Sequence, residues 1–474
     1  MDLPGQGSDD LAADLFKPKC TSGDDGGYGV VLQSDGKIVV AGQTSYGGPG
    51  YDFAVMRYNS DGGLDCTQCL DTGNLVNVYN RAIGADRLWN GAGYLQGQGV
   101  TVAVVDSGIN GHADLQVSGG GNSRVITATS LITSTTTTDG YGHGTHVAGM
   151  FGGNGATTNG ARVGVAPGVN LINVKVANDQ GMSLASDLVH GLEWIYNNRA
   201  AYNIKVVNIS LNSAVAESYQ TSPIDAAVEI LWFNGITVVV SAGNNGGGVL
   251  YPPANDPFVI TVGAMDDKGT WNIDDDEVAP FSAYGMTEDG FSKPDLVAPG
   301  RSIISLLADT NARVYIDHVP YRVDTNLFRM SGTSMSAPMV SGAVALLLQD
   351  EPNLNPDQVK YRLTATANSS WTCIPGAQSC AVPLDDGSFG AGYLDAYAAV
   401  NGTTTETANT GVVVSNMLTT GSDPISWGTV QWGSVQWGSV QWGSVQWGSV
   451  QWGSVQWGSV QWGSVQWGSD YWGP

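Results

Sequence analysis

Three residues of this chain lie in short frames of small residues, and their side chains form the set that acyl transfer through a serine requires. Ser334 lies in Ser-Gly-Thr-Ser-Met-Ser-Ala-Pro, His143 in Gly-His-Gly-Thr-His-Val-Ala-Gly, and Asp106 in Val-Val-Asp-Ser-Gly. A serine hydroxyl is a weak nucleophile at neutral pH, so it needs a base to take its proton and a third group to orient that base. We therefore predict that Ser334 is a nucleophile, that His143 is a general base and then an acid, and that Asp106 orients His143. Gly142 and Gly144, on either side of the histidine, would let a substrate backbone approach closely.

Each of the three residues also has an ordinary structural explanation. Ser334 stands just before an apolar run of helical length and could be a helix N-cap. His143 could be a packed histidine or could share a metal ion with His146, although we expect His146 to be structural. Asp106 could form a local turn with Gly108, as aspartates often do. Because all three residues lie in such frames on one chain, catalysis is the better explanation.

The three frames resemble those of the subtilisin-type serine proteases, the subtilases, in which the residues follow one another in the order Asp, His, Ser. Further blocks support the resemblance: Gly-Val-Ala-Pro at 164–167, Lys-Pro-Asp-Leu-Val-Ala-Pro-Gly at 293–300 and Gly-Tyr-Leu-Asp at 392–395. The resemblance covers residues 81–402. It implies a serine endopeptidase that hydrolyses peptide bonds of protein or peptide substrates through an acyl-enzyme on Ser334, and that needs no cofactor for the chemistry.

The resemblance also implies how the oxyanion is held. Asn244 stands in Ser-Ala-Gly-Asn-Asn-Gly at the end of an apolar strand and matches the side-chain donor, with the backbone N–H of Ser334 as the second donor. Asn245 is the nearest rival, and an ordinary loop asparagine is the structural alternative. The Ala-Gly-Asn frame favours Asn244.

Three segments match the substrate-binding parts of the family. Two of them would form the walls of the pocket for the residue before the scissile bond, and the third would pair with the substrate as an added β-strand. The matching residues are Ser210, Leu211 and Asn212, then Ser241, Ala242 and Gly243, and finally Gly181, Met182 and Ser183. Asn212 departs from the glycine that the family usually has there. Because neither wall holds a carboxylate, we expect broad specificity rather than a demand for Lys or Arg.

A structural calcium ion is a further expectation. Asp114 matches a calcium-ligand position of the family, although the matching loop at 154–160 is longer and built differently. The acidic run at 274–277 could also hold calcium, but a solvated loop is the better explanation.

The elements around these residues predict a doubly wound α/β fold with a mostly parallel sheet flanked by helices. Apolar, β-branched runs alternate with stretches of helical length. The predicted strands lie at 101–105, 171–176, 205–209, 236–240 and 258–262, and the predicted helices at 184–199, 224–233, 335–349 and 357–364. Asp106 then lies at the carboxyl end of the first strand, where open α/β sheets form their sites.

The composition divides the chain into three parts. Residues 1–80 are predicted to form a small β segment, because Asp-Gly turns separate short β-branched runs, and the stretch resembles one unit of bacterial propeller-type repeats. Residues 81–402 form the peptidase domain. Residues 403–474 contain a linker and a Val-Gln-Trp-Gly-Ser repeat tail, for which we expect attachment to a surface or matrix.

The charge and the chain ends exclude several classes of function. The formal net charge is −24, which disfavours nucleic acid and anionic membranes as partners, and no apolar run is long enough to span a bilayer. The first residues lack the features of a signal peptide, whereas the resemblance implies a secreted protein, so we expect an incomplete N-terminus.

Cys373 and Cys380 flank a short loop and are candidates for a disulfide. Two alternatives to an active endopeptidase stay open: a non-catalytic adhesion protein on a subtilase scaffold, and a truncated gene product.

Overall fold

The computed structural model describes residues 70, 72–91, 93–117, 121–132, 136–369, 387–418 and 425–430, and in addition short strands at 26–32, 38–44, 52–58, 436–437, 440–441 and 464–465. The candidate disulfide between Cys373 and Cys380 lies outside the described residues.

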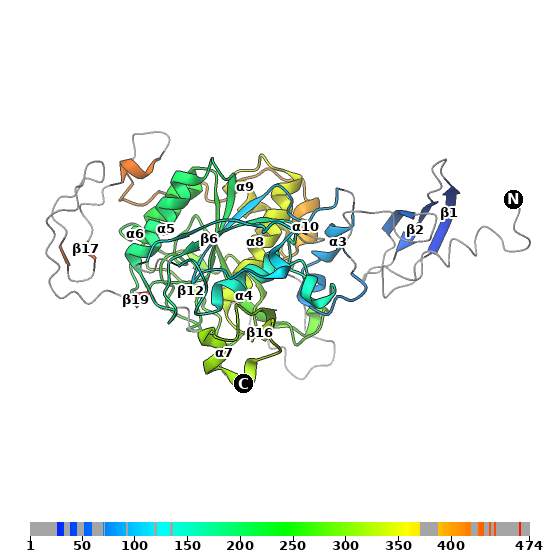
Figure 1. Cartoon of the computed structure of the whole chain (residues 1–474). Coiled ribbons are helices and arrows are strands. Elements are labelled where there is room, and N and C mark those ends of the chain that lie inside the picture. Colours follow the sequence, from blue (N-terminus) through cyan, green and yellow to red (C-terminus); the bar gives the residue numbers. More distant parts are fainter. Residues whose placement is uncertain are drawn as a thin grey trace, which may run out of the picture.

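An eight-stranded sheet forms the centre of the molecule (Figure 1). Its order is β11-β10-β9-β8-β4-β6-β5, with β14 also beside β10. All neighbouring strands run parallel except β10 and β11. The strands are β4 (Thr101–Asp106), β5 (Val125–Ser130), β6 (Asn170–Lys175), β8 (Ile204–Ile209), β9 (Thr237–Ser241), β10 (Ile260–Asp266), β11 (Glu277–Val278) and β14 (Leu296–Pro299). This confirms the predicted doubly wound, mostly parallel sheet.

Two pairs of helices cover the sheet. The helix α4 (His143–Gly152) packs against α8 (Thr333–Asp350), and α5 (Ala185–Asn198) packs against α6 (Pro223–Phe233). The two pairs lie on opposite faces of the sheet, and two neighbouring residues of β4 show this, since successive side chains of a strand point to opposite faces. Val105 faces Gly191 of α5, whereas the next residue, Asp106, faces Gly144 of α4. All six residues of β4 are buried, as expected for a strand that is covered on both faces.

Smaller elements surround this body. The helices are α2 (Tyr79–Ala82), α3 (Asp86–Trp89), α7 (Arg313–Asp317), α9 (Pro356–Thr366) and α10 (Ala396–Asn401), and the strands are β7 (Ser183–Leu184), β12 (Gly285–Met286), β13 (Ser292–Lys293), β15 (Ile303–Leu306) and β16 (Leu327–Met330). No helix of the described part is long and apolar enough to cross a bilayer.

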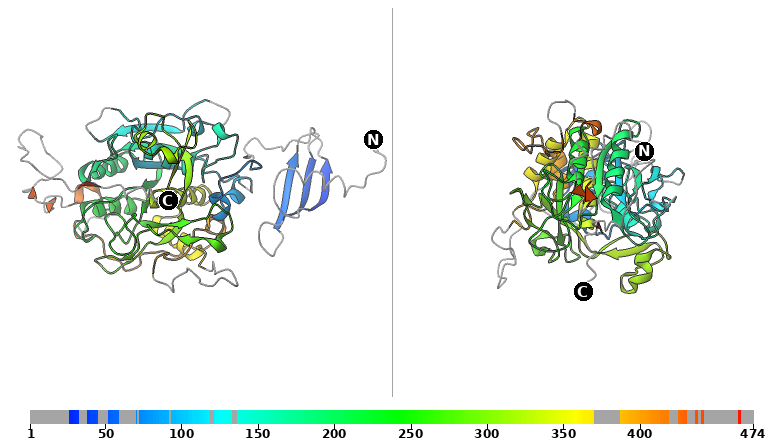
Figure 2. Two further views of the ribbon diagram at one scale, coloured as in Figure 1. Left: turned by 90° about the horizontal axis from the view of Figure 1, so that it is seen from below. Right: turned by 90° about the vertical axis from the view of Figure 1, so that its left-hand side faces the viewer.

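The N-terminal strands form a separate antiparallel sheet in the order β1 (Gly26–Leu32), β2 (Ile38–Thr44), β3 (Asp52–Tyr58). Figure 2 shows this sheet beside the α/β body. The predicted β segment with short strands is thus confirmed.

The chain after residue 402 returns onto the α/β body. The backbone N–H of Ser415 donates to both carboxylate oxygens of Glu229 in α6, at 2.9 and 3.2 Å. Met417 and Leu418 are buried in the core, and Trp427 packs against Tyr196 of α5 with ring centroids 6.1 Å apart. The start of the tail is therefore anchored on α5. Further along, β17 (Gln436–Trp437) pairs with β18 (Val440–Gln441), and β19 (Ser464–Val465) pairs with β7.

Candidate active site

The predicted site residues lie at the carboxyl edge of the sheet. Asp106 is the last residue of β4, and Ser210 directly follows β8. Ser241 is the last residue of β9, and Ser334 is the second residue of α8. In open α/β sheets the crevice at this edge is where ligands bind.

Asp106 and His143 are in direct contact. The Nδ1 atom of His143 lies 2.9 and 3.0 Å from the two carboxylate oxygens of Asp106, and both side chains are buried. Because an ionised carboxylate can only accept, Nδ1 carries the proton and donates it. This bond fixes the tautomer of the ring, so that Nε2 of the neutral imidazole is the basic nitrogen.

The glycines beside His143 are required by the protein itself. Gly142, the N-cap of α4, has a φ of +103°, and a Cβ atom there would lie 2.7 Å from Val314 Cγ2. A Cβ atom on Gly144 would collide with Gly108 O and lie 2.9 Å from Asp106 Oδ1. Glycine at 144 therefore lets α4 approach the end of β4, which is a packing reason that the sequence analysis did not foresee.

A pair of hydrogen bonds joins the start of α8 to the end of β8. The hydroxyl of Ser334 donates to the carbonyl of Ser210 at 3.1 Å, and the hydroxyl of Ser210 donates to the carbonyl of Ser334 at 3.1 Å. The second bond has a simple cause in the sequence. Pro338 lies four residues after Ser334 in α8 and has no N–H to donate to the Ser334 carbonyl, so Ser210 supplies the donor.

The side-chain amide of Asn244 is oriented by Thr333. Its oxygen accepts from the Thr333 N–H at 2.8 Å and from the Thr333 hydroxyl at 3.0 Å. The backbone N–H can only donate, so it identifies the amide oxygen and directs the NH2 group to the opposite side. Thr333 directly precedes Ser334, and its hydroxyl also accepts from the Gly243 N–H at 3.1 Å. Thr333 therefore holds the Asn244 amide next to the start of α8.

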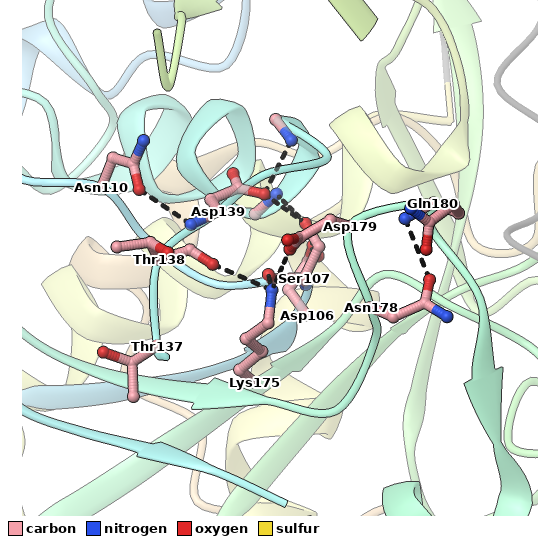
Figure 3. Close-up of polar contacts among 12 residues, drawn as sticks. Asp106, Ser107, Asn110, Thr137, Thr138, Asp139, Lys175, Asn178, Asp179 and Gln180 are labelled. Carbon is pink, nitrogen blue, oxygen red and sulfur yellow. Dashed lines mark hydrogen bonds and ion pairs between the residues drawn. The ribbon is translucent and has the colours of Figure 1, made fainter. Parts of the chain in front are cut away.

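A buried network behind Asp106 was missed by the sequence analysis (Figure 3). The Asp139 carboxylate accepts from the Ser107 hydroxyl at 2.7 Å, the Gly142 N–H at 2.7 Å and the Thr145 N–H at 2.8 Å. Burial raises the pKa of the Asp139 carboxyl, while these donors oppose the rise. The network holds the residue after Asp106 and both ends of the first turn of α4, so it fixes the frame in which His143 meets Asp106.

Lys175 completes this network from the neighbouring strand β6. Its ammonium group donates to the Ser107 carbonyl at 2.5 Å, the Thr138 carbonyl at 2.9 Å and the Asp179 carboxylate at 2.9 Å (Figure 3). The signals for both residues are present in the sequence. Asp139 stands four positions before His143, and Lys175 is the only charged residue in the apolar run at 171–176.

Asn212 joins the two segments that were predicted as pocket walls. Its amide NH2 donates to the carbonyl of Ser241 at 2.9 Å, and the Ser241 hydroxyl lies 3.4 Å from its amide oxygen. The Asn212 side chain is buried. Leu211 and Ala242 are part of the hydrophobic core, so their side chains fix these two segments on the body.

The third predicted segment lies close to Asp106. The Asn178 N–H donates to the Met182 carbonyl at 2.8 Å, which closes a turn with Gly181 at a φ of +75°. Beyond this turn the Ser183 hydroxyl donates to the Val176 carbonyl at 2.6 Å. The Val176 N–H in turn donates to the Asp106 carbonyl at 2.9 Å.

The surroundings of Asp114 do not fit a calcium ion well. One oxygen of its carboxylate accepts from the Thr157 N–H at 2.6 Å, and its carbonyl accepts from the Arg124 guanidinium at 2.7 Å. A cation next to a guanidinium is repelled. Within the described residues, no group of three or more His, Cys, Asp or Glu side chains is arranged to hold a metal ion. Calcium at Asp114 stays a prediction.

His146 lies one turn beyond His143 and is completely buried, with its Nε2 atom 3.1 Å from the Phe328 carbonyl. Burial, with a further contribution from His143, lowers the pKa of His146 from 6.5 to about 3. In the unfolded chain this histidine takes up a proton near its ordinary pKa. Between pH 6.5 and about 3 the unfolded state therefore binds more protons, and the contribution of His146 to stability, complete above pH 6.5, is lost as the pH falls.

We expect His146→Gln to remove this pH dependence. Both proteins carry Ser334→Ala, which removes the predicted nucleophile. As the pH falls below 6.5, the free energy of unfolding should decrease in the chain with His146 by about 1.4 kcal/mol per pH unit more than in the variant. Urea unfolding at pH 7.5, 6 and 5 measures the difference. Parallel pH curves would contradict the buried neutral histidine.

Comparisons with known proteins give the family. The model described as the Subtilase family matches residues 97–392, more than half of the chain, and a β-propeller domain of unknown function matches residues 33–67. Serine protease AprX of Bacillus subtilis (strain 168) is 38% identical over 338 residues, which are 69% of this chain and 72% of that protein. Subtilisin Savinase of Lederbergia lenta is 34% identical over 276 residues, which are 58% of this chain and 86% of that protein.

A crystal structure of a cold adapted subtilisin-like serine proteinase aligns with 59% of this chain and 85% of that chain, with 28% identity and a TM-score of 0.46. The names of these relatives, a serine protease and a subtilisin, do not favour the alternative of a non-catalytic adhesion protein on a subtilase scaffold. The family match spans Asp106, His143, Asn244 and Ser334. The chain belongs to the subtilase family and is a subtilisin-type serine endopeptidase.

Proposed function

We propose that this peptidase cleaves protein substrates through an acyl-enzyme on Ser334, with Asp106 and His143 as the other members of the triad. The observation that carries the proposal is the buried contact of His143 Nδ1 with both carboxylate oxygens of Asp106, at 2.9 and 3.0 Å. It leaves Nε2 as the base that takes the proton from the Ser334 hydroxyl during attack on the substrate carbonyl. The same proton then passes to the leaving amine.

The negative charge of the tetrahedral intermediate is stabilised by two donors. One is the NH2 group of Asn244, which Thr333 holds in its orientation, and the other is the backbone N–H of Ser334. The first turn of α8 adds the positive end of its helix dipole at the same place. Water then attacks the acyl-enzyme, with His143 again as base, and releases the second product. We propose that the protein acts outside the cell.

The test uses the full chain and casein. Wild type should release peptides, and Ser334→Ala should release none. Ser336→Ala is the matched control, because Ser336 is buried two residues further along α8 and its hydroxyl has no hydrogen-bond partner among the described residues. Equal cleavage by Ser334→Ala and wild type would overturn the proposal.

The pocket before the scissile bond is proposed to be short. The buried Asn212 side chain joins the two predicted wall segments through its bond to Ser241, and a glycine at 212 would lack this side chain. A small side chain fits such a pocket better than a large one. We therefore propose that this enzyme prefers small apolar residues at this position, which is narrower than the broad specificity expected from the sequence.

Asn212→Gly should reverse this preference. Burial of a large apolar side chain contributes about 1.5–3 kcal/mol, so the ratio of kcat/KM for a peptide with Phe before the scissile bond to that for the Ala peptide should rise about tenfold or more. The assay compares the two peptides on both proteins. Ser213→Gly, whose hydroxyl accepts from the Val215 N–H, is the control that should leave the ratio unchanged. An unchanged ratio in Asn212→Gly would exclude this role.

A further inference from the structure

The strand β7 is paired with a segment of the repeat tail. Ser464 lies opposite Leu184 and Val465 opposite Ser183, in an antiparallel arrangement. On its other side, Ser183 forms a bridge with Ala177. β19 therefore occupies the edge of β7 that the peptidase body leaves open. The two strands are more than 270 residues apart in the sequence.

The paired residues are one copy of a repeated unit. The dipeptide Ser-Val recurs with a period of five, and every copy between the first and the last has the same neighbours. The copies begin at Ser434, Ser439, Ser444, Ser449, Ser454, Ser459 and Ser464. Strand pairing is made by backbone N–H and carbonyl groups, and all seven copies have the same sequence. Each copy could therefore pair with β7 in the same way as Ser464 and Val465 do.

The open edge of β7 lies close to the proposed catalytic residues. Ser183 is bonded through its hydroxyl to Val176, and Val176 is bonded through its N–H to the carbonyl of Asp106. Met182, the residue before β7, is 57% exposed, so an apolar side chain lies at the surface directly beside this edge. The edge therefore combines backbone groups that the peptidase body leaves for a further strand with an apolar neighbour, which are the features that attract an extended peptide.

The composition of the tail suits this edge. The chain as a whole is strongly acidic, with a formal net charge of −24, but it carries no charged residue between Asp423 and Asp470. The repeat can therefore approach the body without the repulsion that an acidic segment would meet.

The anchor of the tail brings the repeat within reach. Trp427 packs on Tyr196 near the end of α5, and β7 directly precedes the start of the same helix. The helical rise places these two points about 18 Å apart. A chain of the length between Val430 and Ser464 can span more than ~100 Å at its fullest extension, so it is long enough to reach β7.

We propose that the open edge of β7 is a binding surface for the Val-Gln-Trp-Gly-Ser repeat of the same chain, and that the repeat competes there with the substrate strand. The binding part rests on the strand pairing alone. The competition rests on the proposed function and on the prediction that Gly181, Met182 and Ser183 pair with the substrate as an added strand. A tether of this span gives an effective concentration in the millimolar range, so a weakly binding strand raises the apparent KM about three- to tenfold.

A proline-substituted tail tests the competition in the full chain. The valines of the seven Ser-Val pairs are replaced by proline, which has no N–H for a β ladder, and a matched variant carries threonine, which keeps the N–H and the β-branched shape. With a short chromogenic peptide, the proline variant should show an apparent KM about three- to tenfold below that of wild type at the same kcat. The threonine variant should behave as wild type. Equal KM values for all three active proteins would overturn the competition.

Hydrogen exchange tests the binding without any catalysis. In the Ser334→Ala background, the amides at 182–184 should exchange more slowly with the native tail than with the proline tail, and the threonine tail should retain the protection. Equal exchange with native and proline tails would overturn the binding surface, whether or not the wild type is active. Protection that persists when the protein is diluted tenfold supports the tail of the same chain, whereas protection lost on dilution would overturn that assignment in favour of a second copy.

An inactive wild type that still shows tail-dependent protection would count against the proposed function and not against the surface. A fully active enzyme without protection would count against the surface alone. The two proposals therefore fail separately.

Discussion

Ser334→Ala and His143→Ala should each lower kcat by about 10⁶-fold, and the double variant should be no slower than either single variant. The magnitude comes from the triad of subtilisin, a member of the same family, and not from the geometry described above. The reason for the non-additivity is physical. Without the base the hydroxyl keeps its proton, and without the hydroxyl the base has nothing to activate, so either change removes the same step.

The measurement is kcat for a peptide substrate on the four proteins of this cycle, with Ser336→Ala as the control for a change within α8. Circular dichroism on each variant shows that the fold is retained. Losses that multiply in the double variant would mean that Ser334 and His143 act independently, which would contradict their proposed roles. A loss of less than tenfold in either single variant would contradict the triad as well.

Asn244→Ala should lower kcat by about 100- to 1000-fold with little change in KM. The amide is proposed to bind the oxyanion, which exists only on the reaction path, so its loss raises the barrier by about 2.7–4 kcal/mol without weakening the binding of the substrate. This range is the one known for the corresponding donor of subtilisin. Parallel losses in kcat and in kcat/KM are the signature of an interaction made only in the transition state.

Asn245→Ala is the matched control for this prediction. Asn245 is the next residue, and its amide donates to the Val249 carbonyl at 2.9 Å, away from Thr333. This variant should keep kcat within about twofold, as expected of a residue outside the reaction path. If Asn245→Ala lost activity and Asn244→Ala did not, the oxyanion donor would be assigned to the wrong asparagine.

The sequence sufficed for the parts of this protein that depend on local patterns. Buried β-branched runs predicted the parallel strands β4, β6, β8, β9 and β10, because a strand covered on both faces is mostly apolar. The parallel strands β5 and β14 were not predicted, and the side chains of β5 are only partly buried. The position of Asp106 at the end of β4 followed from the same pattern. The contacts of Asp139 and Lys175 with Ser107 did not follow from it. Each residue has a local signal in the sequence, but the two lie in different elements and no spacing along the chain links them to Ser107.

Other features could be recognised only from the packing in three dimensions. Gly144 was noticed in the sequence as a neighbour of His143, but its packing reason, the closeness of Asp106 and Gly108 across two elements, appears only in the fold. The segment after residue 402 has the composition of a linker, yet Ser415 satisfies the buried carboxylate of Glu229. The pentapeptide period predicts neither helix nor continuous strand, and the pairing of Val465 with Ser183 depends on an edge that only the folded body creates.

The central claim is that Ser334 is the nucleophile of this enzyme, and covalent labelling tests it most directly. The full chain is treated with a serine-directed fluorophosphonate, and the intact mass and the peptide map are read together. The account predicts one adduct per chain, on Ser334, that is absent from Ser334→Ala and present in Ser336→Ala. No adduct on a protein shown to be folded by circular dichroism, or an adduct on a different serine, would contradict it.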